Sequence, residues 1–221
     1  MKTLIAIPCL DMMHTEFVQA LVGLRKVGEV QYGFVSSSLI YDARDELAAK
    51  AIEKGFDRVL WLDSDMSFEP DLMERMSADL DEGLDMVSGV YFSRKGPVRP
   101  TIFQECGIIK LPGDKLAPVH KHYMDYPKDT LFEIKACGFG AVMMTTDLLK
   151  RVKDKLGMPF SPAAGFGEDL SFCLRVENVG GKIWCDSRIK LGHVANRLVT
   201  EELYLSLREE NGTGTGSGKE E

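Results

Sequence analysis

The stretch that decides the fold is Arg58-Val59-Leu60-Trp61-Leu62-Asp63-Ser64-Asp65. A short apolar run bounded by polar residues is typical of a strand that is buried on both faces of a parallel sheet. Ligands of open α/β sheets bind beyond the carboxyl ends of the strands, where these two acids are expected. Two neighbouring carboxylates repel each other unless a cation lies between them, and a divalent cation that carries phosphate oxygens fits that role. An acidic surface turn that caps the next helix explains the same spacing equally well.

Strand and helix patterns alternate on both sides of this stretch. Strands are predicted at 4–7, 30–35, 59–62 and 86–90, and helices at 16–27, 41–54 and 70–83. This order predicts a doubly wound, mostly parallel α/β sheet. Further on, strands are predicted at 138–144, 183–185 and 188–191, and helices at 147–156 and from residue 168 to Gly180. We expect one domain over residues 1–210 and a flexible Gly/Thr/Ser-rich tail over 211–221.

An irregular insert over residues 94–135 interrupts this alternation. Its prolines forbid long helices, and 101–103 and 108–111 are predicted to pair as a short hairpin. The insert carries eight Lys/Arg and five Asp/Glu, a local +3 in a chain of −7. The sequence is explained equally well by an acceptor-binding flap and by a solvated connection. His120 and His122 have no third ligand nearby, and a surface loop is the favoured interpretation of this pair.

Composition restricts the classes of protein that fit. A net charge of −7 gives no global electrostatic footprint for nucleic acid or an anionic membrane. Five dispersed cysteines without a C-x-x-C pair argue against a disulfide framework and against structural zinc, and they suit a reducing cytoplasm. The apolar run before Pro8 is too short for a signal peptide or a membrane span.

Two later motifs add groups that carry chemistry. Gly167-Glu168-Asp169 begins a helix, where acids are favoured by the dipole and are explained equally by capping. Gly192-His193 follows a strand directly, and this position favours a metal ligand over an ordinary satisfied histidine. The glycines of Gly138-Phe139-Gly140 indicate that another group approaches the backbone closely there.

Taken in order, these landmarks resemble the GT-A glycosyltransferases. The landmarks are Ile7-Pro8, Asp63-Ser64-Asp65, Gly167-Glu168-Asp169 and Gly192-His193-Val194, and the resemblance is greatest to family 2. The block 167–194 also resembles polypeptide N-acetylgalactosaminyltransferases. The stretches 38–45 and 61–66 are similar to short glycosyltransferases of phages and prophages. The resemblance spans about residues 3–200 and implies a GT-A fold with a single catalytic domain.

The resemblance also implies roles for individual residues. The donor is expected to be a nucleoside diphosphate sugar with UDP as its nucleotide, and Mn²⁺ or Mg²⁺ is expected to be held by Asp65 and His193. Asp63 is expected to face the ribose or donor sugar or to share the metal. The expected donor-contacting residues are Pro8, Leu10, Ser37, Arg44, Asp63, Ser64 and Gly140. Asp169 is the expected catalytic carboxylate, with Glu168 as its substitute. Family 2 similarity favours inversion of the anomeric centre, whereas similarity over 167–194 favours retention.

The acceptor and two other functions stay open. The phage-like resemblance suggests a hydroxymethylated pyrimidine in phage DNA, or a cell-envelope glycan or lipid carrier. We expect an anionic acceptor whose binding weakens as the salt concentration rises. With DNA, phosphate contacts are expected from the basic side chains of the insert, namely Arg94, Lys95, Arg99, Lys121 and Lys128. A non-catalytic nucleotide-sugar-binding or structural phage protein is the main alternative. A nucleotidyltransferase is less favoured, because Cys9-Leu10-Asp11-Met12-Met13 lacks a Gly-rich phosphate loop.

Overall fold

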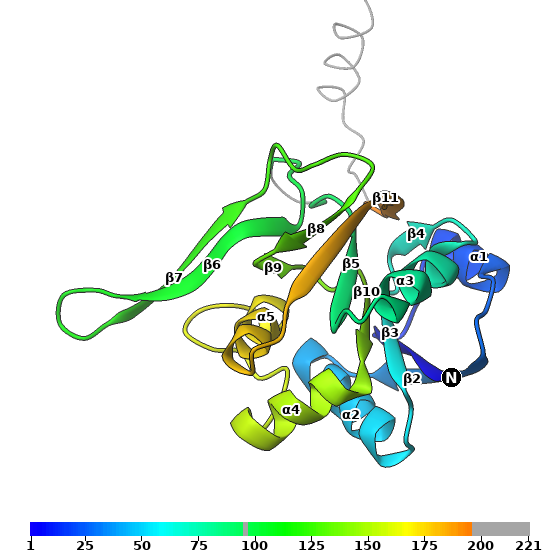
Figure 1. The fold of residues 1–221 in the computed structure, drawn as a ribbon, viewed down its shortest axis with the longest axis horizontal. Helices are drawn as coiled ribbons and strands as arrows, with labels where there is room; N and C mark the ends of the chain where they lie inside the picture. Colours follow the sequence, from blue (N-terminus) through cyan, green and yellow to red (C-terminus); the bar gives the residue numbers. More distant parts are fainter. Residues whose placement is uncertain (95–96, 196–221) are drawn as a thin grey trace, which may run out of the picture.

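An eight-stranded mixed sheet forms the centre of the computed structural model, which describes residues 1–94 and 97–195 (Figure 1). Its order is β2 (Glu29–Ser36), β1 (Lys2–Cys9), β3 (Arg58–Leu62), β10 (Ala141–Thr145), β5 (Met86–Val90), β11 (Ile183–His193) and β4 (Met66–Phe68), with β8 (Leu131–Ile134) also paired to β11. β1 is parallel to β2 and β3, and β5 is parallel to β11. β10 runs antiparallel to both β3 and β5. The predicted mostly parallel α/β sheet is therefore confirmed.

Helices cover both faces of this sheet. α2 (Ile40–Glu53), α4 (Thr146–Leu156) and α5 (Glu168–Asn178) pack in one core, and α1 (Thr15–Gly23) and α3 (Leu72–Asp81) pack in the other. β3 illustrates this arrangement, because its side chains point alternately into the two cores. Val59 and Trp61 point into the first core, and Leu60 and Leu62 into the second. A strand with two buried faces needs the uninterrupted apolar run that the sequence has here.

The insert is more regular than the sequence analysis predicted. β6 (Ile102–Lys110) and β7 (Leu116–His122) form a long hairpin, and β9 (Ala136–Cys137) pairs with β6 in a separate three-stranded sheet. The predicted turn between 103 and 108 was wrong, because the chain turns at 111–115 instead. Proline is tolerated in strands at sheet edges, where its missing N–H faces no partner. Pro118 belongs to β7, which is such an edge, so its presence did not exclude a strand.

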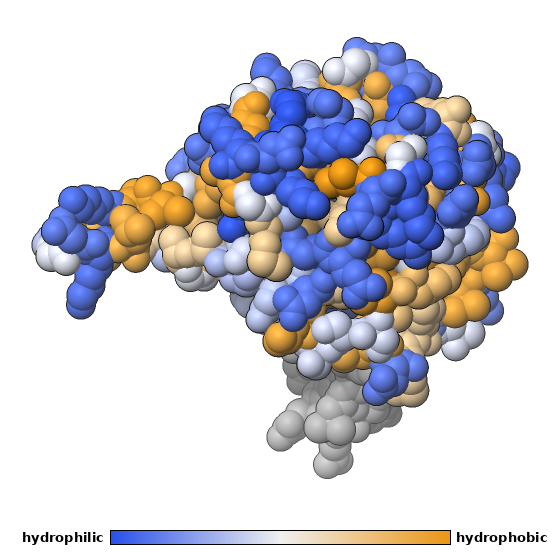
Figure 2. Space-filling view, turned by 90° about the horizontal axis from the view of Figure 1, so that it is seen from below, coloured by the Kyte–Doolittle hydropathy of each residue, from blue (hydrophilic) through white to orange (hydrophobic). Residues whose placement is uncertain are grey.

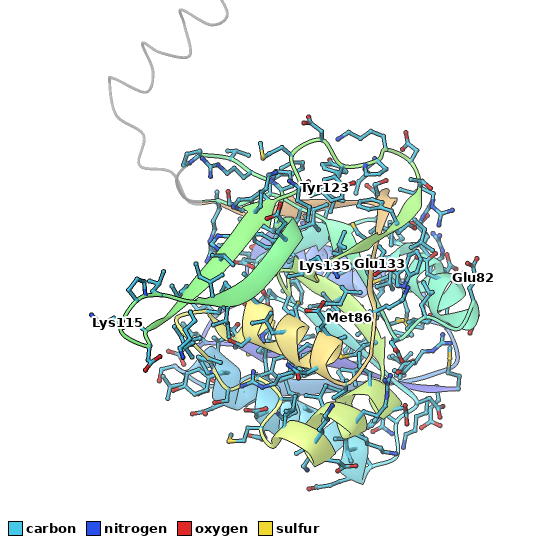
Figure 3. All side chains as sticks on the ribbon, turned by 60° about the vertical axis from the view of Figure 1, so that its left-hand side comes forward. Glu82, Met86, Lys115, Tyr123, Glu133 and Lys135 are labelled. Atoms are coloured by element: carbon cyan, nitrogen blue, oxygen red, sulfur yellow. The ribbon has the colours of Figure 1, made fainter. Side chains whose placement is uncertain are left out.

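The hairpin leaves the body of the molecule as an arm, with Lys115 at its tip (Figures 1 and 3). Its outer half carries exposed Ile108, Ile109 and Leu116, and Figure 2 shows this apolar stretch behind a polar tip. His120 and His122 lie in β7 and pack around Phe103, so the predicted surface loop for this pair was wrong.

Other departures are smaller. β11 is one strand with an irregularity between Asp186 and Lys190, where two short strands were predicted. β10 begins at Ala141 and not at Gly138. The predicted flexible tail, 211–221, and the end of the predicted domain lie outside the described residues. In the described part of the chain, no helix has the length and apolar character required to cross a membrane.

Candidate functional site

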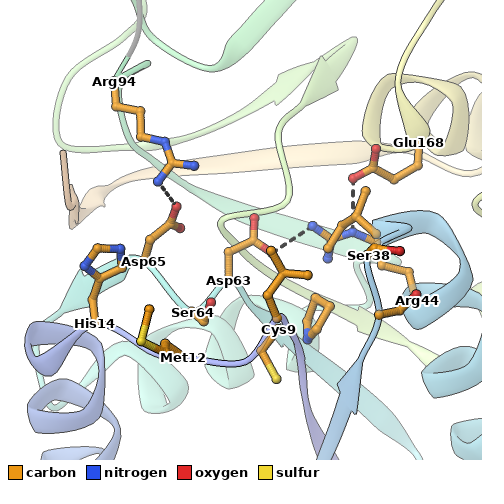
Figure 4. Close-up of a pocket in the computed structure, with 14 residues that line it drawn as sticks. Cys9, Met12, His14, Ser38, Arg44, Asp63, Ser64, Asp65, Arg94 and Glu168 are labelled. Carbon is orange, nitrogen blue, oxygen red and sulfur yellow. Dashed lines mark hydrogen bonds and ion pairs between the residues drawn. The ribbon is translucent and has the colours of Figure 1, made fainter. Parts of the chain in front are cut away.

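A cavity of about 400 Å³ opens where β1, β2 and β3 end (Figure 4). Parallel strands place their carboxyl ends at one edge of the sheet, and the loops that follow them form the walls. The described lining is Pro8, Cys9, Leu10, Met12, His14, Ser37, Ser38, Ile40, Arg44, Asp63, Ser64, Asp65, Arg94 and Glu168. Segments that are far apart in the sequence thus meet at the carboxyl end of β3.

Arg44, on the first turns of α2, is the buried cation of this cavity. Its side chain is 2% exposed, and its Nη2 donates to Asp63 Oδ1 at 2.8 Å. Its Nε contacts Glu168 Oε1 at 3.4 Å, and its guanidinium carbon lies 5.1 Å from the ring centre of Phe139. Burial lowers the pKa of an arginine, but here the two carboxylates outweigh burial and raise it. Arg44 therefore joins the end of β3 to the start of α5.

Asp63 and Asp65 contact different cations, Arg44 and Arg94 (Figure 4). β3 ends at Leu62, so the side-chain alternation of a strand does not extend to the acids. Burial raises the pKa of Asp63, and the ion pair with Arg44 offsets only part of that effect. The Asp63 N–H donates to Gly140 O at 3.0 Å. Gly140 is thus a backbone support of Asp63 and is not part of the cavity lining.

Asp65 contacts both Arg94 and His193. The pairing of β11 with β4 sets His193 opposite Met66, and the Val194 N–H donates to Asp65 O at 2.8 Å. The His193 Nε2 then lies 3.4 Å from Asp65 Oδ2. Burial opposes ionisation of Asp65, but the hydrogen bond with His193 and the charge of Arg94 prevail and lower its pKa. The same hydrogen bond raises the pKa of His193.

The acids of α5 lie at the inner side of the cavity. Glu168 lines it, whereas Asp169 is not among the described lining residues and accepts from the Leu170 N–H at 2.7 Å. Burial and the adjacent Glu168 carboxylate raise the pKa of Asp169 to about 6. A carboxylate with this pKa is a better proton acceptor near neutral pH than an ordinary aspartate.

The structure brings most of the predicted site residues together. Those in the lining are Pro8, Leu10, Ser37, Arg44, Asp63, Ser64, Asp65 and Glu168. Sequence analysis missed six lining residues, namely Cys9, Met12, His14, Ser38, Ile40 and Arg94. All of these except Arg94 lie at or shortly after the carboxyl ends of β1 and β2, so the rule for strand carboxyl ends was sufficient to find them. Arg94 was assigned to the acceptor side, and its contact with Asp65 spans 29 positions of the chain without a local signal.

The donor atoms at Asp65 and His193 fit one divalent cation. His193 Nδ1 lies 2.8 Å from Phe92 O, and because a carbonyl only accepts, Nδ1 carries the hydrogen. Metal-binding histidines commonly donate their second ring N–H in this way. In the neutral ring, Nε2 therefore presents its lone pair on the side of Asp65. Within residues 1–94 and 97–195 there is no group of three such side chains, so two protein ligands are available and Asp63 stays with Arg44.

Comparisons with known proteins gave matches among solved structures only. No family model and no curated protein sequence matched the chain. A197 from STIV has a TM-score of 0.62 and 20% identity, with 89% of this chain and 87% of that chain covered. GalNAc-T7, crystallised with UDP, GalNAc and Mn²⁺, has a TM-score of 0.56 and 12% identity, with coverage of 94% and 47%. S. aureus TarS 1–349 has a TM-score of 0.52 and 15% identity, with coverage of 88% and 60%.

These identities carry an argument about fold and not about activity. The chain spans about half of the GalNAc-T7 chain and somewhat more of TarS, so it corresponds to part of each. Together with the mostly parallel sheet and its helices on both faces, the matches identify the architecture. The chain has the α/β GT-A fold of the glycosyltransferases GalNAc-T7 and TarS.

Proposed function

We propose that this chain is a metal-dependent glycosyltransferase that moves a sugar from a nucleoside diphosphate sugar to an acceptor hydroxyl. The observation that carries the proposal is the cavity at the ends of β1, β2 and β3 of a GT-A fold, where Arg44, Asp63, Asp65 and Glu168 meet. Fold alone does not define activity, and the proposal rests on these side chains.

The charge of the lining supports a requirement for a cation. Three carboxylates (Asp63, Asp65 and Glu168) face two guanidiniums (Arg44 and Arg94), and each guanidinium already contacts a carboxylate. A diphosphate brings further negative charge, which this lining does not neutralise. A divalent cation supplies the missing positive charge.

Asp65 and His193 are the residues that would hold this cation. A ligand set with one imidazole nitrogen suits Mn²⁺ better than Mg²⁺, which prefers oxygen. When bound, the metal supplies a Lewis acid that stabilises the departing diphosphate. Arg94 now contacts Asp65 Oδ2, and a metal bound at this oxygen would displace the guanidinium or share the oxygen with it. The displaced guanidinium would be free to contact the same phosphate groups. Asp63, held by Arg44, faces the donor ribose or sugar.

Asp169 is the proposed catalytic carboxylate. In an inverting reaction it removes the proton from the acceptor hydroxyl, which requires the ionised form. In a retaining reaction it positions the acceptor without an early proton transfer. Glu168 holds Arg44 and, through it, Asp63. Of the two acids, Asp169 therefore acts on the acceptor, and Glu168 supports the donor side.

The proposed donor is a UDP-sugar, on the support that GalNAc-T7 was crystallised with UDP, GalNAc and Mn²⁺. The proposed acceptor is a cell-envelope glycan or a hydroxymethylated pyrimidine in phage DNA, encountered in the cytoplasm. The basic side chains of the insert favour the glycan, because several are neutralised by carboxylates. The pairs are Arg94–Asp65, Lys110–Asp114, Lys121–Glu105 and Lys135–Glu177.

The direct test is incubation with labelled nucleoside diphosphate sugars and Mn²⁺, with and without EDTA. We expect release of nucleoside diphosphate from one donor, and its loss in EDTA. Asp65→Asn should lower the rate at least about a hundredfold, because a metal ligand is worth several kcal/mol of transition-state stabilisation. Asp71→Asn is the matched control, since Asp71 pairs with Arg75 outside this cavity.

Two outcomes would contradict the proposal. Full turnover in excess EDTA excludes the metal. Tight binding of a nucleotide sugar without hydrolysis or transfer, with any acceptor tested, supports the non-catalytic binding protein instead.

A further inference from the structure

Tyr91, directly after β5, contacts Gly140 and His193 and lies near the acids of the proposed site. Its side chain is buried, with 7% of the residue exposed. Burial, followed by the charges of Asp63 and Asp169, raises the pKa of its hydroxyl far above the ordinary value. The hydroxyl is therefore neutral at all physiological pH values. It serves as a hydrogen-bonding group among carboxylates without adding a charge to them.

The hydroxyl holds the backbone that supports Asp63. The Gly140 N–H donates to the Tyr91 oxygen at 3.2 Å, and the carbonyl of the same Gly140 accepts from the Asp63 N–H at 3.0 Å. The two peptide groups that flank the Gly140 Cα thus connect the tyrosine to the first acid of the pair. A buried N–H that loses its acceptor is costly, so the peptide between residues 139 and 140 keeps its orientation while the tyrosine is present.

The same side chain explains Gly138 and, together with Met66, Gly140. A Cβ at residue 138 would overlap the Tyr91 hydroxyl oxygen, and one at 140 would lie 2.8 Å from Met66 Sδ and 2.9 Å from the Tyr91 ring carbon Cζ. Neither glycine has a positive φ, so close approach and not backbone conformation requires them. The Gly138 N–H donates to Thr101 O, and the Thr101 N–H donates to Tyr91 O, which ties the tyrosine backbone to the same turn.

His193 is held by the same short segment of chain. The Tyr91 ring meets the His193 ring edge to face, with centroids 5.4 Å apart and planes at 79°. The carbonyl of the next residue, Phe92, lies 2.8 Å from His193 Nδ1. The ring and the carbonyl together define both the tilt of the imidazole and the nitrogen that carries the hydrogen.

We infer that Tyr91 is a positioning residue, which aligns Asp63 through Gly140 and His193 through its ring. The inference rests on the proposed function for its catalytic meaning, although the arrangement can be measured without turnover. Tyr91 itself does not line the cavity, so it acts through these two residues and not on the donor.

The first measurement is NMR of ¹⁵N-labelled protein. In Tyr91→Phe, which removes only the hydroxyl, we expect the amide resonances of Gly140 and Asp63 to shift. In Tyr91→Leu, which removes the ring, the His193 ring resonances should shift as well. Tyr32→Phe, a hydroxyl deletion on the outer strand β2, is the control and should leave all three unchanged.

The second measurement is a double-mutant cycle on thermal unfolding. Gly138→Ala should lower the midpoint much more in the wild-type background than in the Tyr91→Phe background, because the overlapping oxygen is then absent. We expect the difference to be at least about 4 °C, which corresponds to 1–2 kcal/mol for a domain of this size. This arm stays informative if Tyr91→Leu does not fold.

In the enzyme assay, Tyr91→Phe should lower kcat by about tenfold to a hundredfold, while the acceptor KM changes less than about twofold. Unchanged Asp63 and His193 resonances, together with an equal cost of Gly138→Ala in both backgrounds, would overturn the inference. Absence of turnover by the wild-type protein with every donor would refute the proposed function alone, and the NMR and unfolding results would still decide the role of Tyr91.

Discussion

At the scale of single residues, Arg44 shows how a buried charge is retained. Carboxylates contact its guanidinium at Nη2 and Nε and the ring of Phe139 lies beside it, whereas the buried Nη1 has no hydrogen-bond partner among the described residues. Removal of one partner from a buried pair leaves an unpaired charge, which costs more than the pair contributes. The contact of Arg44 with Glu168 spans 124 positions of the chain, so it exists only in the folded protein.

Asp169 provides the clearest prediction at this scale. Asp169→Asn keeps the size of the side chain and its hydrogen bond at the start of α5, so the fold should survive. Transfer should fall by about 10²–10⁴ if the carboxylate is the general base. Its pKa of about 6 implies that the wild-type rate rises as pH increases through 6, because only the ionised form accepts a proton. The measurement is kcat/KM between pH 5 and 8 for both proteins.

The control for this experiment is Asp147→Asn. Asp147 also occupies the first turn of a helix, α4, but it is exposed and pairs with Arg151. We expect its rate and pH profile to match those of the wild type. An Asp169→Asn variant with the wild-type rate would leave Asp169 with a capping role and transfer the catalytic assignment to Glu168.

At the scale of elements, α3 and β11 are joined by buried carboxylates. Asp186 of β11 is fully buried and Asp79 of α3 is 3% exposed, and both receive hydrogen bonds from Arg188. One guanidinium does not neutralise two carboxylates. Burial and the charge of Asp186 accordingly raise the pKa of Asp79 to about 6. The folded state therefore binds a proton that the unfolded chain, with an ordinary aspartate, binds less tightly.

This difference predicts how stability depends on pH. Because the folded-state pKa of Asp79 is raised, its contribution to stability is present below about pH 4 and is lost as pH rises through about 6. Asp79→Asn cannot lose a proton. Relative to the wild type, the variant should gain about 2 kcal/mol in free energy of unfolding between pH 4.5 and pH 8. Urea unfolding at the two pH values measures this gain.

Asp154→Asn is the control, since it makes the same change at an exposed position of α4. Its free energy of unfolding should differ from that of the wild type by the same amount at both pH values. If Asp79→Asn behaved in this way too, Asp79 would not share a proton with Asp186 in the folded protein.

At the scale of the whole molecule, charge is distributed unevenly between the body and the insert. The chain carries −7, while residues 94–135 carry +3, so the remainder carries −10. Arg94 contacts Asp65 in the cavity, and Lys121 lies 3.7 Å from Glu105. Part of the positive charge in the described insert is therefore compensated by carboxylates of the folded chain.

The proposed glycan acceptor predicts an interaction with little dependence on salt. For a neutral glycan, we expect the acceptor KM to change less than about twofold between 50 and 200 mM salt. Duplex DNA would instead give a slope of log K against log salt of about −0.9 for each phosphate contact. Parallel titrations with hydroxymethylated DNA, plain DNA and a glycan acceptor provide the measurement.

The variants Lys121→Ala and Lys128→Ala test whether hydroxymethylated DNA is the acceptor. If hydroxymethylated DNA were the acceptor, each phosphate contact that was removed would reduce the slope by about one. Transfer to this DNA with such a slope would contradict the glycan assignment.

The amino-acid sequence by itself determined the layered α/β architecture and the place of the candidate site. Hydrophobic periodicity is local, so the strands around Val59 and Met86 and the helices between them were predictable within a few residues. The carboxyl-end rule then predicted that Pro8, Ser37 and Asp63 lie at one edge of the sheet. These inferences needed only the order of elements along the chain.

The tertiary structure alone decided which groups meet. The hairpin register, the contact of Arg94 with Asp65 and the position of Tyr91 against two glycines all depend on strand pairing between distant segments. No short window of sequence contains both partners of such a contact. A cation such as Arg94 was therefore assigned to the acceptor side from composition, although packing places it in the lining of the cavity.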